Sequence, residues 1–352
     1  MISLGYCHEL LTAGNMGWQK RTNPVSFYLR AVGKIVSVVI LVFVLFTSSL
    51  VVGAEPKKVR IGFTTFTMEQ LPYQLAKQRG YFTEEGLNPE FIKMSGPTID
   101  MAIASEDILY SSASTSALRA GVNGIAAKVL WVGSGKAIMF LMVKPEIKRI
   151  SDLKGKRIGV ARVGSSADLG IRAMLKAKGV DPRDITVISI GSTETRLVAL
   201  KAGSIDAAPL TVPANFHAEA AGLNSLGFIG DYLPTSFGGL GIHSAALNQE
   251  PKIVEALVRI GLKGLRVMKQ DKAFTVEFMR AFSNLKEKSL AEQVYDSTIG
   301  HFTDDGVISE KEQKEILEMA RKELKVEKSI NPGVFDFSIA RKVNRDLAKW
   351  KP

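Results

Sequence analysis

The sequence has 352 residues, of which 46% are hydrophobic and 23% are charged, and its formal net charge is +11. This is an ordinary globular composition, and a chain of this length can bury one large core or two medium ones. A basic surface could attract nucleic acid, but the lysines and arginines are spread beside acidic residues, without basic runs or interleaved aromatic residues. The sequence therefore predicts no nucleic-acid partner.

Residues 1–54 have the pattern of a secretory signal peptide. Basic residues, the last of them Lys34, precede an uncharged apolar run at 35–52, and small residues ending in Ala54 follow it. We expect cleavage near Ala54 and a periplasmic mature protein, with the residues before Met16 representing an over-long gene start. The apolar run is also long enough to span a bilayer, so an uncleaved anchor is the alternative.

Cys7 is the single cysteine of the sequence and lies before the apolar run. Cleavage would leave a mature chain with neither a disulfide nor a thiol nucleophile. Because Cys7 does not follow the run, it cannot serve as a lipid attachment site behind a signal. We therefore expect a soluble periplasmic protein rather than a lipoprotein.

From residue 55 onward, short β-rich runs alternate with helical runs that end at glycine, which predicts an α/β fold with mostly parallel sheets. The first strand is expected at 59–63, and the next helix ends at Gly80, since glycine readily takes the left-handed conformation after a helix. The pattern restarts near Pro145. Further strands are expected at 108–110, 127–132, 157–161, 185–190, 207–210 and 240–247, and the later helices at 251–269, 272–282, 290–302 and 309–324.

The two halves of this region echo each other. In each half a helix end, a tight turn and an aspartate precede a small strand, and the aspartates are Asp107 and Asp206. We interpret both as turn residues rather than ligand contacts.

Few residues could carry catalysis. His217, His243 and His301 are far apart in the sequence and lack the spacing of metal-ligand pairs. The Gly-Ser-Gly-Lys segment at 133–136 follows a strand but lacks the remaining residues of a phosphate-binding loop. The sequence predicts no catalytic residue and no cofactor.

Residues 301–312 resemble a calcium-binding loop at several positions. His301 and Thr303 stand where such a loop requires carboxylates, however. A helix cap by Ser309, with Glu312 three residues later, explains the same residues. We therefore predict no metal site.

The best candidates for ligand binding are hydroxyl and glycine residues just past strand ends, because ligands of open α/β sheets bind there. Gly164, Ser165 and Ser166 form the sharpest case. They open a helix whose free N–H groups, with two hydroxyls, suit a carboxylate, sulfonate, nitrate or phosphate group, while a simple helix cap by one serine is the alternative. The full set comprises Thr64, Thr65, Phe66, Ser112, Ser114, Thr115, Gly133, Ser134, Gly164, Ser165, Ser166 and Thr211.

Three blocks of sequence resemble the nitrate/sulfonate/taurine-type periplasmic binding proteins, a family also described as SsuA/THI5-like or NMT1-like. The blocks are 72–87 (PYQLAKQRGYFTEEGL), 152–160 (DLKGKRIGV) and 200–207 (LKAGSIDA). The resemblance covers roughly residues 58–247. It implies the type II periplasmic-binding-protein fold: two α/β lobes with mixed, mostly parallel sheets, joined by crossover strands near 141–145 and 236–240.

The same resemblance implies how the chain divides and what it does. Residues 55–144 and 237–352 would form lobe I, to which the carboxy-terminal helices return, and residues 145–236 would form lobe II. The cleft between the lobes would be lined by the loop after the first strand, by Ser112 and Ser114, and by residues 164–166. The expected function is the extracytoplasmic solute-binding component of an ABC transporter. As a monomer, it would capture a small molecule with a carboxylate or other anionic group for an inner-membrane permease.

Two other functions stay open. Relatives on the same scaffold synthesise the thiamine pyrimidine or act in menaquinone formation, so an enzyme is one alternative, although the histidine-poor sequence and the export signal argue against it. A membrane-anchored sensor is the other, and an uncleaved segment at 35–52 would favour it. Lys136 and Arg162 are expected near the rim of the cleft, but no set of charged residues identifies the ligand.

Overall fold

The computed structural model describes residues 55–64, 67–282, 285, 287–328 and 330–352. The predicted signal peptide, Thr65 and Phe66 lie outside the described residues. In the ranges described, no helix combines the length and the apolar sequence that a membrane span requires.

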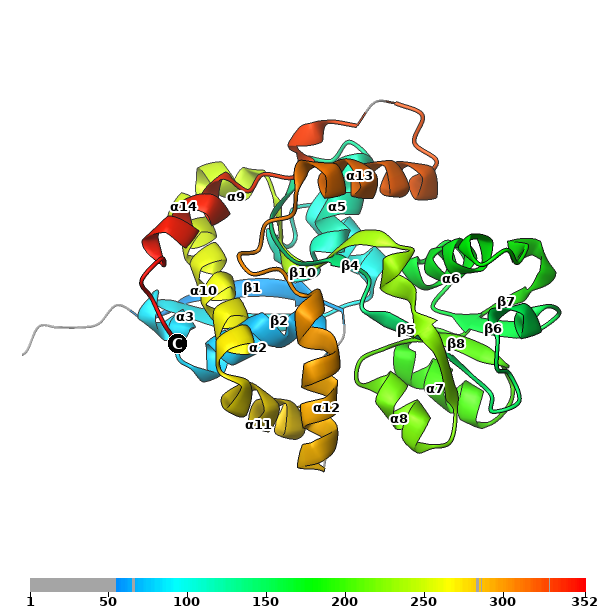
Figure 1. Cartoon of the computed structure of the whole chain (residues 1–352). Helices are drawn as coiled ribbons and strands as arrows, with labels where there is room; N and C mark the ends of the chain where they lie inside the picture. The colour runs from blue at the N-terminus through cyan, green and yellow to red at the C-terminus, as the bar shows by residue number, and fades with distance from the viewer. Residues whose placement is uncertain (1–54, 65–66, 283–284, 286, 329) are drawn as a thin grey trace, which may run out of the picture. The chain divides into compact units, whose positions relative to one another are not determined.

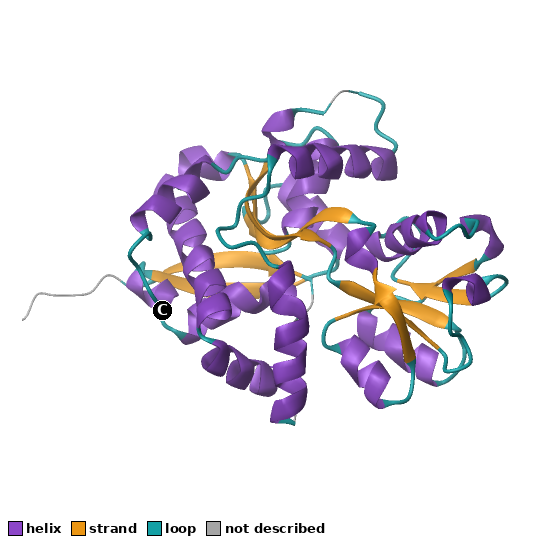
Figure 2. Ribbon diagram, in the orientation of Figure 1, coloured by secondary structure: helices purple, strands orange, loops and turns teal. Residues whose placement is uncertain are grey.

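The described strands form two five-stranded mixed sheets, each surrounded by helices (Figures 1 and 2). The first sheet has the order β2-β1-β3-β10-β4, with β1 parallel to β2 and β3 and with β10 antiparallel to β3 and β4. The second has the order β7-β6-β8-β5-β9, with β6 parallel to β7 and β8 and with β5 antiparallel to β8 and β9. The predicted α/β class and two-lobed architecture are confirmed. The strands are β1 (Lys57–Phe63), β2 (Leu87–Lys93), β3 (Tyr110–Ser111), β4 (Ala127–Lys136), β5 (Met139–Val143), β6 (Arg157–Val160), β7 (Thr186–Ser189), β8 (Ala207–Thr211), β9 (Asn224–Phe228) and β10 (Pro234–His243).

The chain passes from the first sheet to the second between β4 and β5, and returns between β9 and β10. Both passages precede the predicted positions at 141–145 and 236–240. The reason is that Met139 already pairs with Thr211 in the second sheet, and Pro234 already pairs with Lys136 in the first. We call the first sheet and its helices lobe I, and the second sheet and its helices lobe II.

The helices of lobe I include the longest described helix, α10 (Pro251–Gln270), which packs against α2 (Leu71–Gln78) (Figure 1). Gly264 allows this approach, because a Cβ atom there would lie 1.9 Å from the carbonyl oxygen of Pro72. The remaining helices of lobe I are α3 (Tyr81–Glu84), α4 (Gly96–Ala104), α5 (Ser114–Val122), α9 (Ala245–Gln249), α11 (Lys272–Phe282), α12 (Lys288–Thr298), α13 (Glu310–Leu324) and α14 (Ser338–Asp346), and those of lobe II are α6 (Ser166–Ala177), α7 (Thr193–Lys201) and α8 (Ala214–Ala220).

The core of lobe I is built around Trp131 of β4, whose side chain is fully buried. Its indole N–H donates to the hydroxyl oxygen of Tyr73 (3.2 Å), and that hydroxyl donates to the carbonyl oxygen of Leu257 in α10 (3.1 Å). Strand, α2 and α10 are thus joined by hydrogen bonds inside an apolar core, where each polar group needs a partner.

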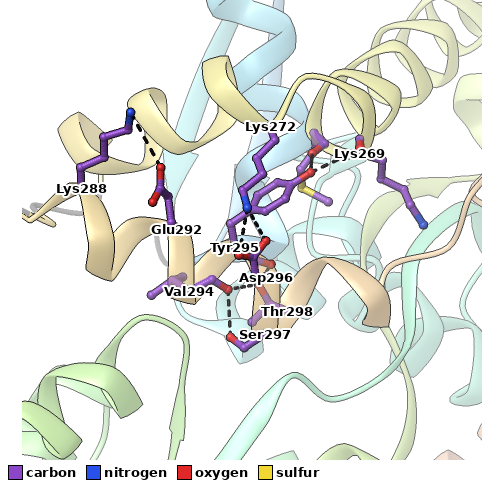
Figure 3. Close-up of polar contacts among 10 residues, drawn as sticks. Lys269, Lys272, Lys288, Glu292, Val294, Tyr295, Asp296, Ser297 and Thr298 are labelled. Carbon is purple, nitrogen blue, oxygen red and sulfur yellow. Dashed lines mark hydrogen bonds and ion pairs between the residues drawn. The ribbon is translucent and has the colours of Figure 1, made fainter.

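Helices α11 and α12 are held to the end of α10 by polar contacts (Figure 3). The Tyr295 hydroxyl lies within hydrogen-bond distance of the carbonyl oxygens of Met268 (3.0 Å) and Lys269 (3.3 Å). These carbonyls belong to the last turn of α10 and have no partner within the helix. Lys272 pairs with both carboxylate oxygens of Asp296, at 2.6 and 2.9 Å. The contacts fix the path of the chain beyond α10.

Asp206 joins three segments of lobe II. Its carboxylate accepts hydrogen bonds from the backbone N–H of Arg157 (2.9 Å), from the Arg157 guanidinium (3.0 Å) and from Lys144 (2.7 Å). These contacts, the Arg157 side chain first, hold the pKa of Asp206 far below its usual range. Asp206 is therefore a structural residue, whereas the matching Asp107 of lobe I accepts a hydrogen bond from the hydroxyl of Ser105 (2.6 Å).

Asp206→Asn is expected to lower the free energy of unfolding by about 2 kcal/mol at pH 7, because hydrogen bonds to a charged partner are lost. Since the pKa of Asp206 is depressed in the folded state, its contribution is complete above the unfolded pKa of about 4 and is lost as the pH falls below it. Urea unfolding of wild type and variant should therefore show a smaller difference at pH 3 than at pH 7. Asp107→Asn is the matched control, with an expected change below about 0.5 kcal/mol. A difference that is equally large at both pH values would contradict the assignment.

Candidate functional site

A cleft of about 300 Å³ is lined by residues of both lobes. It lies where the parallel strands of each sheet end and the following helices begin, as expected for an α/β fold. Lobe I contributes Thr64, Thr67, Glu69, Gly96, Pro97, Asp100, Ala113, Thr115, Ser116, Arg119, Thr235 and Phe237, lobe II contributes Met139, Ala161, Arg162, Ser165, Ser166, Ala167, Thr193, Arg196 and Thr211, and Ala137 lies between the lobes.

Five of the candidate ligand-binding residues line this cleft, as does Arg162, which was expected near its rim. They come from strand ends and helix starts in both lobes, which is why residues far apart in the sequence meet here. The five are Thr64, Thr115, Ser165, Ser166 and Thr211.

Other residues singled out from the sequence do not line the cleft. Ser112, Ser114 and Ser134 are fully buried. The Ser112 hydroxyl donates to the side chain of Gln70, Ser114 donates to the carbonyl oxygen of Gly238 (2.6 Å), and Ser134 accepts from the backbone N–H of Lys136 (3.1 Å). All three side chains are therefore buried within lobe I.

Two glycines predicted for the site also lie outside the cleft lining. Gly133 is a buried position of β4, where a Cβ atom would lie 2.9 Å from the carbonyl oxygen of Phe237. Gly164 turns the chain with φ of 77°, and its N–H donates to the carboxylate of Asp168 (2.8 Å). Both glycines therefore shape the backbone beside the cleft.

Four helices begin at the cleft: α4 and α5 in lobe I, and α6 and α7 in lobe II. The first turn of each contributes a lining residue: Pro97, Thr115, Ser166 and Thr193, respectively. The first N–H groups of a helix lack partners within it, and the helix dipole adds positive partial charge at this end. A serine N-cap already accepts from one N–H group in each of α4, α6 and α7, and the remaining N–H groups of the four helix starts favour a negative group in the cleft.

Ser165 is the N-cap of α6. Its hydroxyl oxygen accepts from the backbone N–H of Asp168 (3.4 Å). Ser166 follows at the first helical position, and within the described ranges its hydroxyl has no recorded hydrogen bond. Ser165 can thus cap the helix while the hydroxyl of Ser166 is available to contact a ligand in the cleft.

Arg196, in the first turns of α7, is the most informative side chain of the cleft. It is only 3% exposed and donates to the carbonyl oxygens of Pro209 (3.1 Å) and Gly191 (2.6 Å) and to the hydroxyl of Thr193 (2.9 Å). Among the described residues no carboxylate forms an ion pair with it, and burial lowers its pKa to about 10 although Glu194 acts in the opposite direction. A buried cation without a counter-ion is costly.

The arginine on the lobe I side is compensated. Arg119 of α5 forms ion pairs with Asp100 of α4 (3.2 Å) and with Glu323 of α13. Burial raises the pKa of both carboxyl groups, and Arg119 and Arg162 counteract this. Two carboxyl groups thus face Arg119 in lobe I and also interact with Arg162 of lobe II, whereas Arg196 has no carboxylate partner among the described residues.

Glu69 provides a carboxyl group on the lobe I side. It belongs to the short 3-10 helix Met68–Gln70, and Gly238 donates its backbone N–H to Oε1 (3.3 Å). Burial raises the pKa of Glu69 to about 7, and the hydrogen bond from Gly238 only partly offsets this. At neutral pH this side chain is therefore partly protonated.

Sequence reasoning missed Glu69, Asp100, Arg119 and Arg196. For Arg196 a signal existed, because the Gly-Ser pair at 191–192 caps a helix after a predicted strand and places the next turn at the sheet edge. For Glu69 there was none, since the chain between β1 and α2 has no regular pattern.

Among the described residues no group of three or more His, Cys, Asp or Glu could hold a metal ion. In the segment that resembled a calcium loop, the Ser309 hydroxyl accepts from the backbone N–H of Glu312 (3.2 Å), and the Glu312 carboxylate accepts from the N–H of Ser309 (2.8 Å). These residues cap α13.

Comparison with known proteins gives one family match and several distant relatives. Residues 67–273 match the family described as NMT1/THI5 like. The riboflavin-binding protein RibY of Chloroflexus aurantiacus is 24% identical over 244 residues, which are 65% of this chain and 68% of RibY.

Two solved structures illustrate what the fold supports. The alkanesulfonate-binding protein SsuA from Xanthomonas axonopodis pv. citri, bound to MOPS, has a TM-score of 0.64 and 20% identity, covering 81% of this chain and 99% of SsuA. The desulfurization enzyme DSZB has a TM-score of 0.60 and 12% identity, covering 82% of this chain and 99% of DSZB. One fold thus carries a binding protein and an enzyme, and the cleft must decide between them.

Proposed function

Because the chain belongs to the NMT1/THI5-like family, we propose that it is the solute-binding component of an ABC importer and that its cleft captures a small molecule with an acidic group. Binding draws the two lobes together around the ligand, and the closed protein docks as a periplasmic monomer on an inner-membrane permease. RibY and SsuA, both named for what they bind, support this class of function.

The observation that carries the proposal is the buried charge of Arg196, which has no carboxylate partner in the described part of the chain. A cation that is 97% buried would ordinarily be paired, and the starts of four helices at the same cleft add further positive potential. An anionic group of the ligand supplies the missing counter-charge. Neutral donors come from the hydroxyl of Ser166 and from one hydroxyl of the Thr193–Thr211 pair, whose oxygens are hydrogen-bonded to each other (3.1 Å).

The size and the remaining lining of the cleft suit a small organic acid. Its volume of about 300 Å³ is at the lower end of ligand pockets. Apolar residues complete the wall, among them Pro97, Met139 and Phe237. They suit a hydrocarbon or aromatic body attached to the acidic group.

Binding without turnover fits the lining better than catalysis does. None of the described cleft residues is histidine or cysteine, so Glu69, whose pKa is raised by burial to about 7, is the candidate for a general base, and no thiol or imidazole nucleophile lines the cleft with it. The distinguishing measurement is recovery of the ligand after long incubation with the protein. Its chemical conversion would favour the enzyme alternative.

A thermal-shift screen tests the proposed function directly. The purified protein is incubated with alkanesulfonates, nitrate, bicarbonate, aromatic carboxylates, riboflavin and thiamine precursors. A ligand at a hundredfold excess over its Kd is expected to stabilise the folded state by about 2.7 kcal/mol. Stabilisation by an acid, and none by its neutral amide, supports the proposal, whereas a response only to uncharged compounds contradicts it.

Replacing Ser165 and Ser166 together by alanine is expected to weaken binding of such an acid about tenfold. One hydroxyl contact to the ligand is lost, and the first turn of α6, without its N-cap, holds its N–H groups less firmly toward the cleft. Loss of the Ser165 cap also lowers the free energy of unfolding by about 1 kcal/mol. Calorimetric titration and urea unfolding measure the two effects. Ser309→Ala, which removes a cap from α13 outside the cleft, should reproduce the stability loss alone. Unchanged affinity in the double variant would remove these serines from the site.

A further inference from the structure

Glu69 lines the cleft, and its carboxyl group can form more hydrogen bonds than the one it forms with Gly238. Within the described ranges its carboxyl accepts one hydrogen bond, from Gly238 to Oε1, and the other oxygen has no recorded partner. A carboxylate can accept about four hydrogen bonds, and a neutral carboxyl can also donate one. The position is fixed by a close backbone approach, since a Cβ atom at Gly238 would lie 2.9 Å from the carbonyl oxygen of Glu69.

A second polar group beside Glu69 is also without a partner. Thr67 lines the cleft and is 9% exposed, and its hydroxyl oxygen has no hydrogen bond to any described residue. Buried hydroxyls normally have at least one partner. Two side chains of one short segment thus offer unused hydrogen-bonding atoms to the same cleft.

Among the described residues, none of the cleft arginines forms an ion pair with Glu69. Burial raises the pKa of Glu69 to about 7, and the hydrogen bond from Gly238 partly offsets this. Close pairing with an arginine would lower it instead. The cleft consequently has two chemically different walls: a cationic wall around Arg196 in lobe II, and a wall in lobe I that carries the Glu69 carboxyl group without an arginine partner among the described residues.

We propose that Glu69 is a specificity-determining residue that binds a neutral hydrogen-bond donor, a hydroxyl or an N–H, at the end of the ligand opposite its acidic group. The inference rests on the function proposed above and narrows the ligand to small organic acids with a polar, uncharged far end. A hydroxyl fits because it donates to the ionised carboxylate, accepts from the protonated carboxyl and can reach the Thr67 hydroxyl. An ammonium group fits less well, since it must be stripped of water without a second carboxylate to hold it.

The test compares matched probes that differ by one hydroxyl: benzoate with 4-hydroxybenzoate, and propanesulfonate with 3-hydroxypropanesulfonate. Calorimetric titration of the full protein is expected to show about tenfold tighter binding of the hydroxylated member of at least one pair. Glu69→Leu should abolish the preference, so that the ratio of the two Kd values within each pair falls to about one. Glu69→Gln, whose amide still accepts and donates, should retain the preference. Glu90→Leu, on the exposed side of β2 outside the cleft, is the control.

Three results would overturn the inference while leaving acid binding intact. They are equal affinities within both pairs, a preference that survives in Glu69→Leu, and tighter binding of 4-(aminomethyl)benzoate than of 4-hydroxybenzoate. If none of these acids binds the wild-type protein and the thermal-shift screen yields no other acid, the proposed function itself is wrong, and this inference falls with it.

Discussion

Arg196→Met is expected to weaken binding of the acidic ligand about a hundredfold. The guanidinium is buried, lines the cleft and has no carboxylate partner among the described residues, so we expect the ligand anion to supply its counter-charge. Removing one member of a desolvated, hydrogen-bonded charge pair typically costs about 2–5 kcal/mol, and a hundredfold corresponds to about 2.7 kcal/mol. Calorimetric titration with the acids found in the screen measures the loss.

The same substitution should affect folding much less than binding. Methionine removes three hydrogen bonds to Pro209, Gly191 and Thr193, but it also removes a buried, unpaired charge, and the two effects offset each other. Arg196→Lys, which keeps the positive charge but lacks the planar guanidinium group with its paired N–H donors, should bind the acid with intermediate affinity. Arg183→Met, at an exposed ion pair with Asp181 outside the cleft, is the matched control. Equal affinity of wild type and Arg196→Met would show that the anion binds elsewhere.

Gly264→Ala is expected to lower the free energy of unfolding by about 3 kcal/mol. The added methyl group would lie 1.9 Å from the carbonyl oxygen and 2.6 Å from the carbonyl carbon of Pro72. Both are backbone atoms, so no side chain can rotate away, and α10 must separate from α2 across a tightly packed core. The higher helix propensity of alanine recovers only about 1 kcal/mol. Urea unfolding followed by circular dichroism measures the difference.

Gly300→Ala is the control for this prediction. No atom lies within 4 Å of a Cβ built at Gly300, and its φ is not in the left-handed region. Its effect on stability should stay within about 0.5 kcal/mol. A Gly264→Ala variant as stable as Gly300→Ala would show that α10 and α2 have more freedom to separate than their packing indicates.

Much of the fold could be predicted from the sequence because it depends on local rules. Gly80, Gly179 and Gly203 have positive φ and follow helices, as expected of glycine stops. The β10 strand was recognised only in part: it begins at Pro234 rather than near residue 240. Its first residues pair across a bulge between Pro234 and Phe237, which breaks the regular alternation that identifies a strand.

The candidate site was less predictable, because a sequence places residues along an element without saying which side faces the cleft. Ser114 and Thr115 are adjacent at the start of α5, but only Thr115 lines the cleft, while Ser114 bonds to Gly238. The buried guanidinium of Arg196 donates hydrogen bonds to the carbonyl oxygens of Gly191 and Pro209. Both residues lie outside α7, so the helix sequence alone does not predict that Arg196 is buried. Strand ends therefore predicted five residues that line the cleft, and tertiary packing determined the charged groups of that cleft.

The position of β10 in the first sheet has a consequence for the order of folding. The second sheet has all its strands once residue 228 has been synthesised. The first sheet lacks the strand between β3 and β4 until residue 243, and the β3–β10 pairing closes a loop from Ser111 to Gly241. Long loops are costly to close, and non-local strand pairing forms slowly. Lobe II can thus form its native strand pairings first. Lobe I completes its sheet only when β10 is available, and by then the segment between β4 and β10 has already folded as lobe II.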